Sequence, residues 1–262
     1  MTLPRAITRR AIGWFLALLV IALPIAAFAQ RGGGGRFFGF GGRRAVLPNV
    51  PYDGRFTMAR IRYQPNRNWD ADYPTMERNL TVMLDKITAL SPHLDGSNVH
   101  DFDDPELLKY PLAYLTEPGY WHPSPAEVEG LRTYIAKGGF LIVDDFHFAN
   151  EWWVFEQGIR AALPSARIER LDISHPIFNC FFQIPSLVVP YPGRLGEAGL
   201  MGEFYGIYED NDPSKRLQVV INYNIDIGDY MEWSNEPGWF AAAPTNEAYK
   251  FAINYIVYGM SH

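Results

Sequence analysis

The stretch Gly138-Gly139-Phe140-Leu141-Ile142-Val143-Asp144-Asp145 decides the fold. Its two glycines are typical of the end of a helix, and its four apolar residues in a row are typical of a strand buried on both faces. The preceding helix is marked by Ser124 as N-cap, by Pro125 at the first helical position and by Glu127, which completes a capping box. Together with the short apolar stretch 112–115, the segment predicts a parallel strand–helix–strand unit that ends in two aspartates.

The alternation of strands and helices extends in both directions along the chain. Hydrophobic periodicity predicts strands at residues 56–63, 98–100, 112–115, 140–143 and 166–171, and helices at residues 74–90, 125–137, 152–163 and 245–258. Residues 204–208 and 217–223 flank the turn 211–214 and predict an antiparallel hairpin. The sequence therefore predicts an α/β fold, a doubly wound and mostly parallel sheet with an appended antiparallel hairpin.

The composition supports a folded domain and excludes several classes of protein. Of the 262 residues, 48% are hydrophobic and 20% are charged, so the chain has enough apolar surface for a core. The single cysteine, Cys180, excludes an internal disulfide and a zinc cluster built on cysteines. With 23 basic and 29 acidic residues the formal charge is −6, which argues against nucleic acid as a partner.

The N-terminal residues have the layout of a secretory signal. Arginines within the first ten residues precede the apolar run 11–27, and Ala27-Phe28-Ala29 supplies small residues for cleavage after Ala29. Residues 1–29 are therefore predicted to be a signal peptide, and the mature protein is expected to be periplasmic or secreted. The alternative is an uncleaved inner-membrane anchor over residues 11–29, since about seventeen apolar residues can just span a bilayer.

Two further segments follow the predicted signal. Residues 30–49 are rich in glycine and arginine, and they are expected to form a flexible linker because glycine at this density cannot hold a helix or a packed strand. The sequence shows no second linker, so residues 50–262 are expected to form a single α/β domain.

A series of short motifs stands in one order within residues 55–260. The motifs are Arg60-Ile61-Arg62-Tyr63, Asn79-Leu80, Tyr110-Pro111-Leu112-Ala113-Tyr114-Leu115, Leu131-Arg132-Thr133-Tyr134, the glycine–aspartate stretch quoted above and His175-Pro176-Ile177-Phe178. Together they resemble a bacterial family catalogued as domain of unknown function 4159. The resemblance implies a flavodoxin-like fold similar to class I glutamine amidotransferases, with no established activity. It also implies an envelope protein partner, because the family is often associated with MoxR-type ATPases and von Willebrand A-domain proteins.

The residues argue against amidotransferase chemistry. Such an enzyme needs a reactive cysteine in a tight strand-to-helix turn, with a histidine as its base. The corresponding turn here reads Asp144-Asp145-Phe146-His147 and contains neither a thiol nor a serine or threonine hydroxyl. Cys180 lies among aromatic residues in an irregular stretch, where a buried and inert thiol is expected. The sequence therefore favours a protein without catalytic residues of this kind.

Acidic and imidazole side chains follow several of the predicted strands. In an open parallel sheet, ligands bind beyond the carboxyl ends of the strands, so these side chains are expected to form an acidic rim there. The candidate ligand-binding residues of the rim are Asp101, Asp144, Asp145, His147, Asp172 and His175. If the rim binds a divalent metal, the expected ligands are Asp144, Asp145, His147 and His175.

Purely structural roles are the alternative for the same residues. Asp144 or Asp145 can cap the helix that follows, and His175 can fix the turn before Pro176. The stretch Asp103-Asp104-Pro105-Glu106 is expected to be the N-cap of a helix on a solvated loop.

Two functions remain open on the sequence alone. The first hypothesis is an exported, non-catalytic domain that binds a partner protein or a ligand through its acidic rim. The alternative is a metal-assisted hydrolase that acts on a cell-envelope saccharide or a related substrate. Tryptophans in loops or at helix starts are either binding or core residues, and they are Trp121, Trp152, Trp153, Trp233 and Trp239.

Overall fold

The computed structural model describes residues 46–65, 68–94 and 97–262. The predicted signal peptide, residues 1–29, and most of the predicted linker lie outside the described residues. In the part of the chain that is described, every helix is too short or too polar to cross a membrane.

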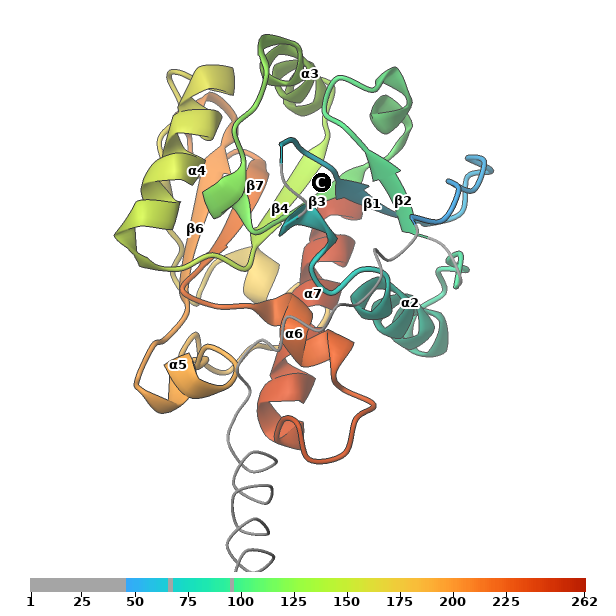
Figure 1. Cartoon of the computed structure of the whole chain (residues 1–262), viewed down its shortest axis with the longest axis vertical. Helices are drawn as coiled ribbons and strands as arrows, with labels where there is room; N and C mark the ends of the chain where they lie inside the picture. The colour runs from blue at the N-terminus through green and yellow to red at the C-terminus, as the bar shows by residue number, and fades with distance from the viewer. Residues whose placement is uncertain (1–45, 66–67, 95–96) are drawn as a thin grey trace, which may run out of the picture. The chain divides into compact units, whose positions relative to one another are not determined.

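Seven strands of the described residues form one sheet, in the order β2-β1-β3-β4-β7-β6-β5 (Figure 1). The strands are β1 (Met58–Ile61), β2 (Ser97–His100), β3 (Leu112–Thr116), β4 (Phe140–Asp144), β5 (Glu169–Arg170), β6 (Glu203–Tyr208) and β7 (Leu217–Tyr223). The strands β2, β1, β3, β4 and β7 are parallel, whereas β6 is antiparallel to both β5 and β7. The sheet confirms the predicted mostly parallel, flavodoxin-like α/β class.

The predicted hairpin is present as β6 and β7, but it is part of the main sheet. The strand β7 pairs in parallel with β4 from Leu141↔Val219 to Val143↔Ile221. It also pairs antiparallel with β6. The residues after β7 therefore lie at the same edge of the sheet as the residues after β4.

Helices cover both faces of the sheet. The longer helices are α2 (Thr75–Ile87), α3 (Pro125–Ala136), α4 (Phe148–Ala162) and α7 (Ala242–Ser261), and the short ones are α5 (Arg194–Glu197) and α6 (Ile227–Glu232). Short 3₁₀ helices occur at η1 (Asn68–Asp70), η2 (Pro105–Lys109), η3 (Pro118–Tyr120), η4 (Pro176–Phe178) and η5 (Glu209–Asn211). In Figure 1, α2, α6 and α7 lie together in the lower part of the view, and α3 and α4 lie in the upper part.

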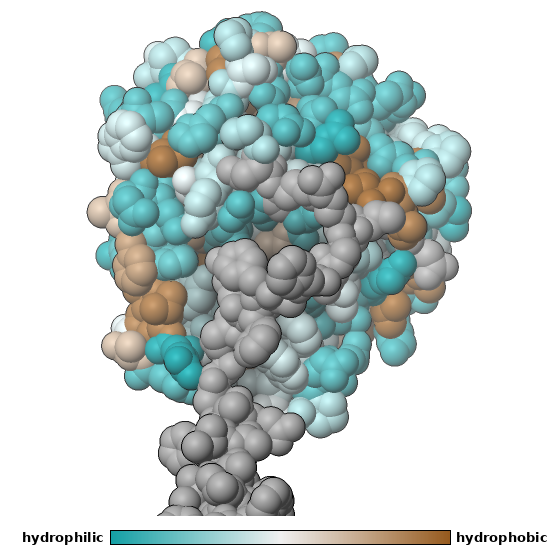
Figure 2. All heavy atoms as spheres, viewed as in Figure 1, coloured by the Kyte–Doolittle hydropathy of each residue, from teal (hydrophilic) through white to brown (hydrophobic). Residues whose placement is uncertain are grey.

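The pleat of β4 divides the core into two layers. Phe140 and Ile142 pack on the side that carries α2 and α7, whereas Leu141 and Val143 pack on the side that carries α3 and α4. All four residues are buried, as predicted for a strand covered on both faces. The face seen in Figure 2 is mostly hydrophilic, and hydrophobic residues gather in separate places near its margins.

The predicted helix start before β4 is confirmed. The Ser124 hydroxyl accepts a hydrogen bond from the Glu127 amide (3.2 Å), and the Glu127 carboxylate accepts one from the Ser124 amide (2.8 Å). Asp104 is the N-cap of η2, as predicted. Helix α4 begins at Phe148, four residues earlier than predicted, because the Glu151 carboxylate accepts a hydrogen bond from the His147 amide (2.7 Å).

Side-chain amides cover the open edge of the sheet at β2. The Asn49 side chain donates to the Val99 carbonyl (2.9 Å) and accepts from the Val99 amide (2.8 Å). The Asn98 side chain pairs with the Val50 backbone in the same reciprocal way. The Asn49 contacts satisfy backbone groups that an edge strand leaves open to another chain, and the Asn98 contacts hold the segment at Val50 against this edge.

The order of the strands places the candidate site. Strand β1 lies between β2 and β3 in the sheet. The chain therefore goes from β1 to the neighbouring strand on one side, β2, and then to the neighbouring strand on the other side, β3. A crevice outside the carboxyl ends of the strands is expected at such a switch point. The segments after β1, β3, β4 and β7 all begin at this edge.

Candidate functional site

Asp144, the last residue of β4, is a fully buried anchor. Its carboxylate accepts hydrogen bonds from the Tyr114 hydroxyl (2.6 Å), the Asn222 side chain (3.0 Å) and the amides of Ile227 and Gly228 (3.0 Å each). Burial raises the pKa of Asp144 to about 6, although these hydrogen bonds act in the opposite direction. Asp144 therefore ties β3, β4 and β7 to the start of α6.

The expectation that Asp144 or Asp145 caps the helix after β4 is wrong. The N-cap of α4 is His147, and its amide is held by Glu151. Asp144 does accept backbone N–H groups, but they belong to α6, more than eighty residues further along the chain. The parallel pairing of β7 with β4 brings α6 to this position.

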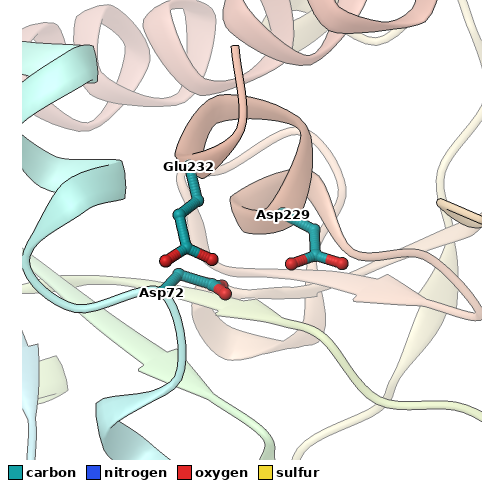
Figure 3. A group of neighbouring side chains, drawn as sticks. All are labelled: Asp72, Asp229 and Glu232. Atoms are coloured by element: carbon teal, nitrogen blue, oxygen red, sulfur yellow. The ribbon is translucent and has the colours of Figure 1, made fainter. Parts of the chain in front are cut away.

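Next to this anchor, five carboxylates form what we call the acidic cluster. One group consists of Asp72, Asp145 and Asp226, and a second consists of Asp72, Asp229 and Glu232. In each group, one ligand-type atom from every residue lies within 4.8 Å of those from the other two. Figure 3 shows Asp229 and Glu232 reaching from α6 toward Asp72, which comes from the loop below them.

Three neighbouring segments supply the cluster. Asp72 follows β1, Asp145 follows β4, and Asp226 is the N-cap of α6 after β7. Asp72 and Asp145 have left-handed backbone conformations, with φ of 62° and 58°. Such a conformation is uncommon for residues other than glycine, although aspartate tolerates it better than most. The two sharp turns place both side chains in the same carboxylate group.

Four of the five carboxylates of the cluster are withdrawn from water, and Asp229 is partly exposed. The exposed fractions are 8% for Asp72, 7% for Asp145, 4% for Asp226 and 8% for Glu232. Burial and, after it, the neighbouring carboxylates raise the pKa values of Asp72, Asp145 and Asp226 well above the ordinary value. The carboxylates of the cluster therefore require either protonation or a nearby cation.

Among the described residues, the buried cation Arg60 lies close enough to Asp72 to lower its pKa. The Arg60 guanidinium is fully buried, but it is engaged in an ion pair with Glu77 and donates to the carbonyls of Trp69 and Ala71. The Asp72 Oδ2 atom is buried and has no hydrogen-bond partner among the described residues. Desolvation of a polar atom without a partner is costly, so Asp72 is the least satisfied member of the cluster.

Aromatic side chains border the cluster at Asp145. The Tyr191 hydroxyl donates a hydrogen bond to Asp145 Oδ1 (3.0 Å). The His147 ring lies edge-on to Tyr191, with the ring centroids 5.2 Å apart, and its other neighbour is Phe148 at 4.6 Å. His147 Nδ1 is 3.4 Å from Glu151, so the ring belongs to this aromatic border and lies outside both carboxylate groups.

Two predicted rim residues interact with groups outside the acidic cluster. Asp101, after β2, forms a two-pronged ion pair with Arg62, at 2.8 and 2.6 Å. Asp172, after β5, is exposed and accepts a hydrogen bond from the nearby Ser174 amide (2.9 Å). Neither aspartate belongs to a carboxylate group of the cluster.

His175 lies near the opposite edge of the sheet. Its ring centroid is 5.9 Å from that of Tyr258, whose hydroxyl accepts from the amide of Leu217, the first residue of β7. The His175 ring accepts a hydrogen bond from the Ile177 amide (3.2 Å), which fixes the turn before Pro176 as the structural alternative predicted. The predicted metal ligands Asp144, Asp145, His147 and His175 are therefore not brought together as one set.

Cys180 has the surroundings expected of a structural thiol. It is half-buried against the core layer of α7, and its Sγ is 3.3 Å from the Asn254 carbonyl. Burial raises the pKa of this thiol above its ordinary value, which disfavours the nucleophilic thiolate. The turn after β4, where an amidotransferase has its nucleophile, carries the acidic residues described above.

The tryptophans divide between core and surface. Trp121 is fully buried, and Trp152 packs against Phe146 and Tyr223. The remaining tryptophans in question lie at the surface or partly so; Trp153 has an exposed fraction of 61%, and Trp233 stacks on Trp239 with centroids 4.2 Å apart. None of these rings lies among the described contacts of the cluster.

Most residues of the cluster were not predicted from the sequence. Asp145 was among the candidates, whereas Asp72, Asp226, Asp229 and Glu232 were not. A signal for three of them is present, since Asp226, Asp229 and Glu232 follow the strand 217–223 at intervals of three residues and so share one helical face. Asp72 lies in a loop without periodicity, and no local pattern points to it.

The fold and the site define an α/β domain with a largely buried acidic cluster at the carboxyl edge of its sheet. A comparison with family models matches residues 57–260 to the family described as Domain of unknown function (DUF4159). The match covers most of the chain, and the chain belongs to this family. The search of curated proteins found no match.

Proposed function

We propose that the domain binds a divalent cation at Asp72, Asp145 and Asp226. The observation that carries this proposal is the convergence of three carboxylates, each more than nine-tenths buried, within 4.8 Å. One of them, Asp72, has an oxygen without a hydrogen-bond partner among the described residues. A bound cation would supply that missing partner.

Electrostatic repulsion favours the binding of a cation over protonation of the carboxylates. Two ionised carboxylates at this separation repel each other by roughly 3–4 kcal/mol at an effective dielectric constant of about 20. Protonation relieves the repulsion only while the pH is below the raised pKa values. A divalent cation relieves it at neutral pH and also satisfies the acceptor atoms, so binding is coupled to the release of protons.

The ligand atoms select the type of ion. An all-oxygen set suits Ca²⁺, Mg²⁺ or Mn²⁺, whereas Zn²⁺ and Cu²⁺ favour sites with imidazole or thiolate. Mg²⁺ usually keeps several water molecules, for which residues with exposed fractions of 4–8% leave little room. We therefore take Ca²⁺ as the preferred ion.

The same burial favours a binding role over hydrolysis. A catalytic metal needs an open coordination position and space for a substrate, and the small exposed fractions of Asp72, Asp145 and Asp226 speak against both. We therefore favour a non-catalytic, ion-binding domain over a metal-assisted hydrolase.

The proposed setting is the cell envelope. The signal-like residues 1–29 support export to the periplasm or beyond, with an uncleaved anchor over residues 11–29 as the alternative. Extracellular calcium modules bind with dissociation constants of about 10⁻⁴–10⁻³ M, which is the range we expect here. An envelope protein of the MoxR or von Willebrand A-domain systems is the partner that the family resemblance supports.

Thermal denaturation tests the proposal. Protein stripped with a chelator should gain roughly 5–10 °C in Tm when free Ca²⁺ reaches about 100 times Kd, since an ion that binds only the folded form adds about 2.7 kcal/mol under that condition. Asp85→Asn, a change at an exposed site on α2, should leave this shift intact. Equal Tm values with chelator and with saturating Ca²⁺ would overturn the proposal.

A further inference from the structure

We infer that Tyr191 is the gate of the cation site, and that its ring must leave Asp145 before an ion can enter or escape. This inference rests on the function proposed above, because it assigns the control of ion exchange at that same site. The observation that carries it is the hydrogen bond from the Tyr191 hydroxyl to Asp145 Oδ1 (3.0 Å), which joins a proposed ion ligand to a surface loop.

The residues 189–202 form what we call the gate loop. Its two ends lie side by side, because the Gly202 amide donates to the Val189 carbonyl (2.8 Å) and the Tyr191 amide donates to the Leu200 carbonyl (3.0 Å). A compact surface loop with adjacent ends is an Ω-loop. The gate loop belongs to the long connection between η4 and β6, in which α5 is the one helix. Long connections with little regular structure often act as lids over binding sites.

The base of the gate loop contacts two of the segments that supply the cluster. The Pro190 carbonyl accepts a hydrogen bond from the Tyr230 hydroxyl (3.0 Å), which comes from α6. The next residue, Tyr191, reaches Asp145 in the turn after β4. The loop therefore extends from α6, which Asp226 caps, to the turn that carries Asp145. It lies across the place where these two segments meet.

The tip of the gate loop is exposed. Gly193 and Gly199 flank α5, which is labelled in Figure 1, and both have left-handed backbone conformations, with φ of 68° and 95°. A Cβ atom at either glycine would have no neighbour within 4 Å, and the side chains of Arg194 and Glu197 are exposed. Movement of the tip would therefore break few buried contacts, and the two tyrosine hydroxyls hold the base.

The closed position of Tyr191 fits both an empty and an occupied site. Asp72, Asp145 and Asp226 are each more than nine-tenths buried, so an ion reaches them only after a rearrangement. Tyr191 is partly exposed while its hydroxyl touches Asp145, so its side chain extends from the surface to the ligand. It uses only Oδ1, and the second oxygen of the same carboxylate is left for an ion. The gate therefore controls the rate of exchange more than the affinity.

The rates of Ca²⁺ binding and release test the inference. Tyr191→Phe keeps the ring and removes the hydroxyl that holds it closed. We expect kon and koff to rise together by roughly tenfold, the factor for the loss of one hydrogen bond to a charged group. Line shapes in nuclear magnetic resonance spectra of the whole chain, recorded through a Ca²⁺ titration, give Kd and koff together.

Tyr205→Phe is the matched control. The Tyr205 hydroxyl donates to the Glu203 carboxylate (2.8 Å) within β6, so this variant also loses a hydrogen bond between a tyrosine and a carboxylate. It should retain the wild-type rates of exchange. A rise in koff with unchanged kon in Tyr191→Phe would show that Tyr191 only stabilises the bound ion, and would overturn the gate. Wild-type rates in both Tyr191→Phe and Tyr191→Ala, with folding checked by circular dichroism, would overturn it as well.

A measurement on the wild-type protein makes the test independent of any variant. Relaxation dispersion of the backbone amides of residues 189–202 in the Ca²⁺-loaded protein should show opening at a rate no slower than koff. Opening slower than koff would overturn the gate and leave the proposed function standing. If the wild-type protein binds no Ca²⁺ in the titration, the proposed function itself is overturned.

Discussion

Asp144 and Asp145 are neighbours in the sequence, yet their surroundings differ completely. Asp144 points into the sheet and accepts hydrogen bonds from Tyr114, Asn222 and the first turn of α6. Asp145 turns the other way through a left-handed backbone and meets Asp72 and Asp226, with a hydrogen bond from Tyr191. Four donors surround the first carboxylate, whereas one donor and two other carboxylates lie beside the second.

The difference separates a structural carboxylate from one that is placed for a ligand. The donors around Asp144 are all part of the folded chain, so that site is complete as it stands. Asp145 and Asp226 each accept a hydrogen bond, from the Tyr191 hydroxyl and the Asp229 amide, but the neighbouring carboxylates raise one another's pKa, so their site becomes complete only with protons or cations. The predictions below test this contrast, from the largest expected effect to the smallest.

Removal of Asp144 should have the largest effect on stability. In Asp144→Ala the Tyr114 hydroxyl, the Asn222 amide and two backbone N–H groups lose their acceptor inside the core. We expect a loss of roughly 3–5 kcal/mol in the free energy of unfolding, with or without Ca²⁺. Urea denaturation measures it, and a loss below about 1 kcal/mol would show that Asp144 is not an anchor.

Neutralisation of Asp145 should increase the stability of the protein when no metal is present. Asp145→Asn removes one of the mutually repelling charges and keeps the shape of the side chain, so Tm in the presence of a chelator near pH 8 should rise. The same variant should lose the Ca²⁺-dependent shift of roughly 5–10 °C expected of the wild-type protein. A variant that keeps the full shift would show that Asp145 is not a ligand.

The stability of the chelated protein should fall as the pH rises. Burial raises the folded-state pKa of Asp144 to about 6, and burial with neighbouring carboxylates raises those of Asp72 and Asp145 well above the ordinary value near 4. The folded state then binds more protons than the unfolded state. The contribution of these carboxyl groups to the stability is fully present below about pH 4 and is lost as the pH rises through their folded-state pKa values.

Thermal melts at several pH values measure this slope. The chelated wild-type protein should have a higher Tm near pH 5 than near pH 8, and saturating Ca²⁺ should reduce or reverse the difference, because Ca²⁺ competes with the protons. A Tm in chelator that rises steadily from about pH 5 to pH 8 would contradict the raised pKa values.

Cys180→Ala should have the smallest effect. The thiol is half-buried on the core layer of α7, far along the chain from the strand-end turns, so its loss should cost about 1 kcal/mol or somewhat more as a packing defect. Ca²⁺ binding should be unchanged. Rapid labelling of the native protein by a thiol reagent at neutral pH would show that Cys180 is more reactive than its surroundings indicate.

Much of the fold could be predicted because its signals are local. The capping box at Ser124 and the apolar run from Phe140 to Val143 determine a helix and a strand without reference to the rest of the chain. The six-residue helix α6 is too short to show a hydrophobic period, so it was missed. The pairing of β7 with β4 joins segments some eighty residues apart, and no local pattern encodes it.

A residue of the candidate site could be predicted only where its position after a single recognisable strand was enough to place it. Asp145 follows a strand that is obvious in the sequence, and it is in the cluster. Asp72 and Asp226 meet it only because the order of the strands brings the segments after β1 and β7 to the same place. His175 was expected nearby because its segment follows a predicted strand, but the chain turns back there and packs the ring near Tyr258.

The most direct test of the central claim is an anomalous difference map. A crystal soaked in Ca²⁺ and measured at long wavelength should show a peak about 2.3–2.6 Å from carboxylate oxygens of Asp72, Asp145 and Asp226. The same map from Asp145→Asn should lack that peak. A wild-type map with calcium peaks at other sites and none at these three carboxylates would contradict the account.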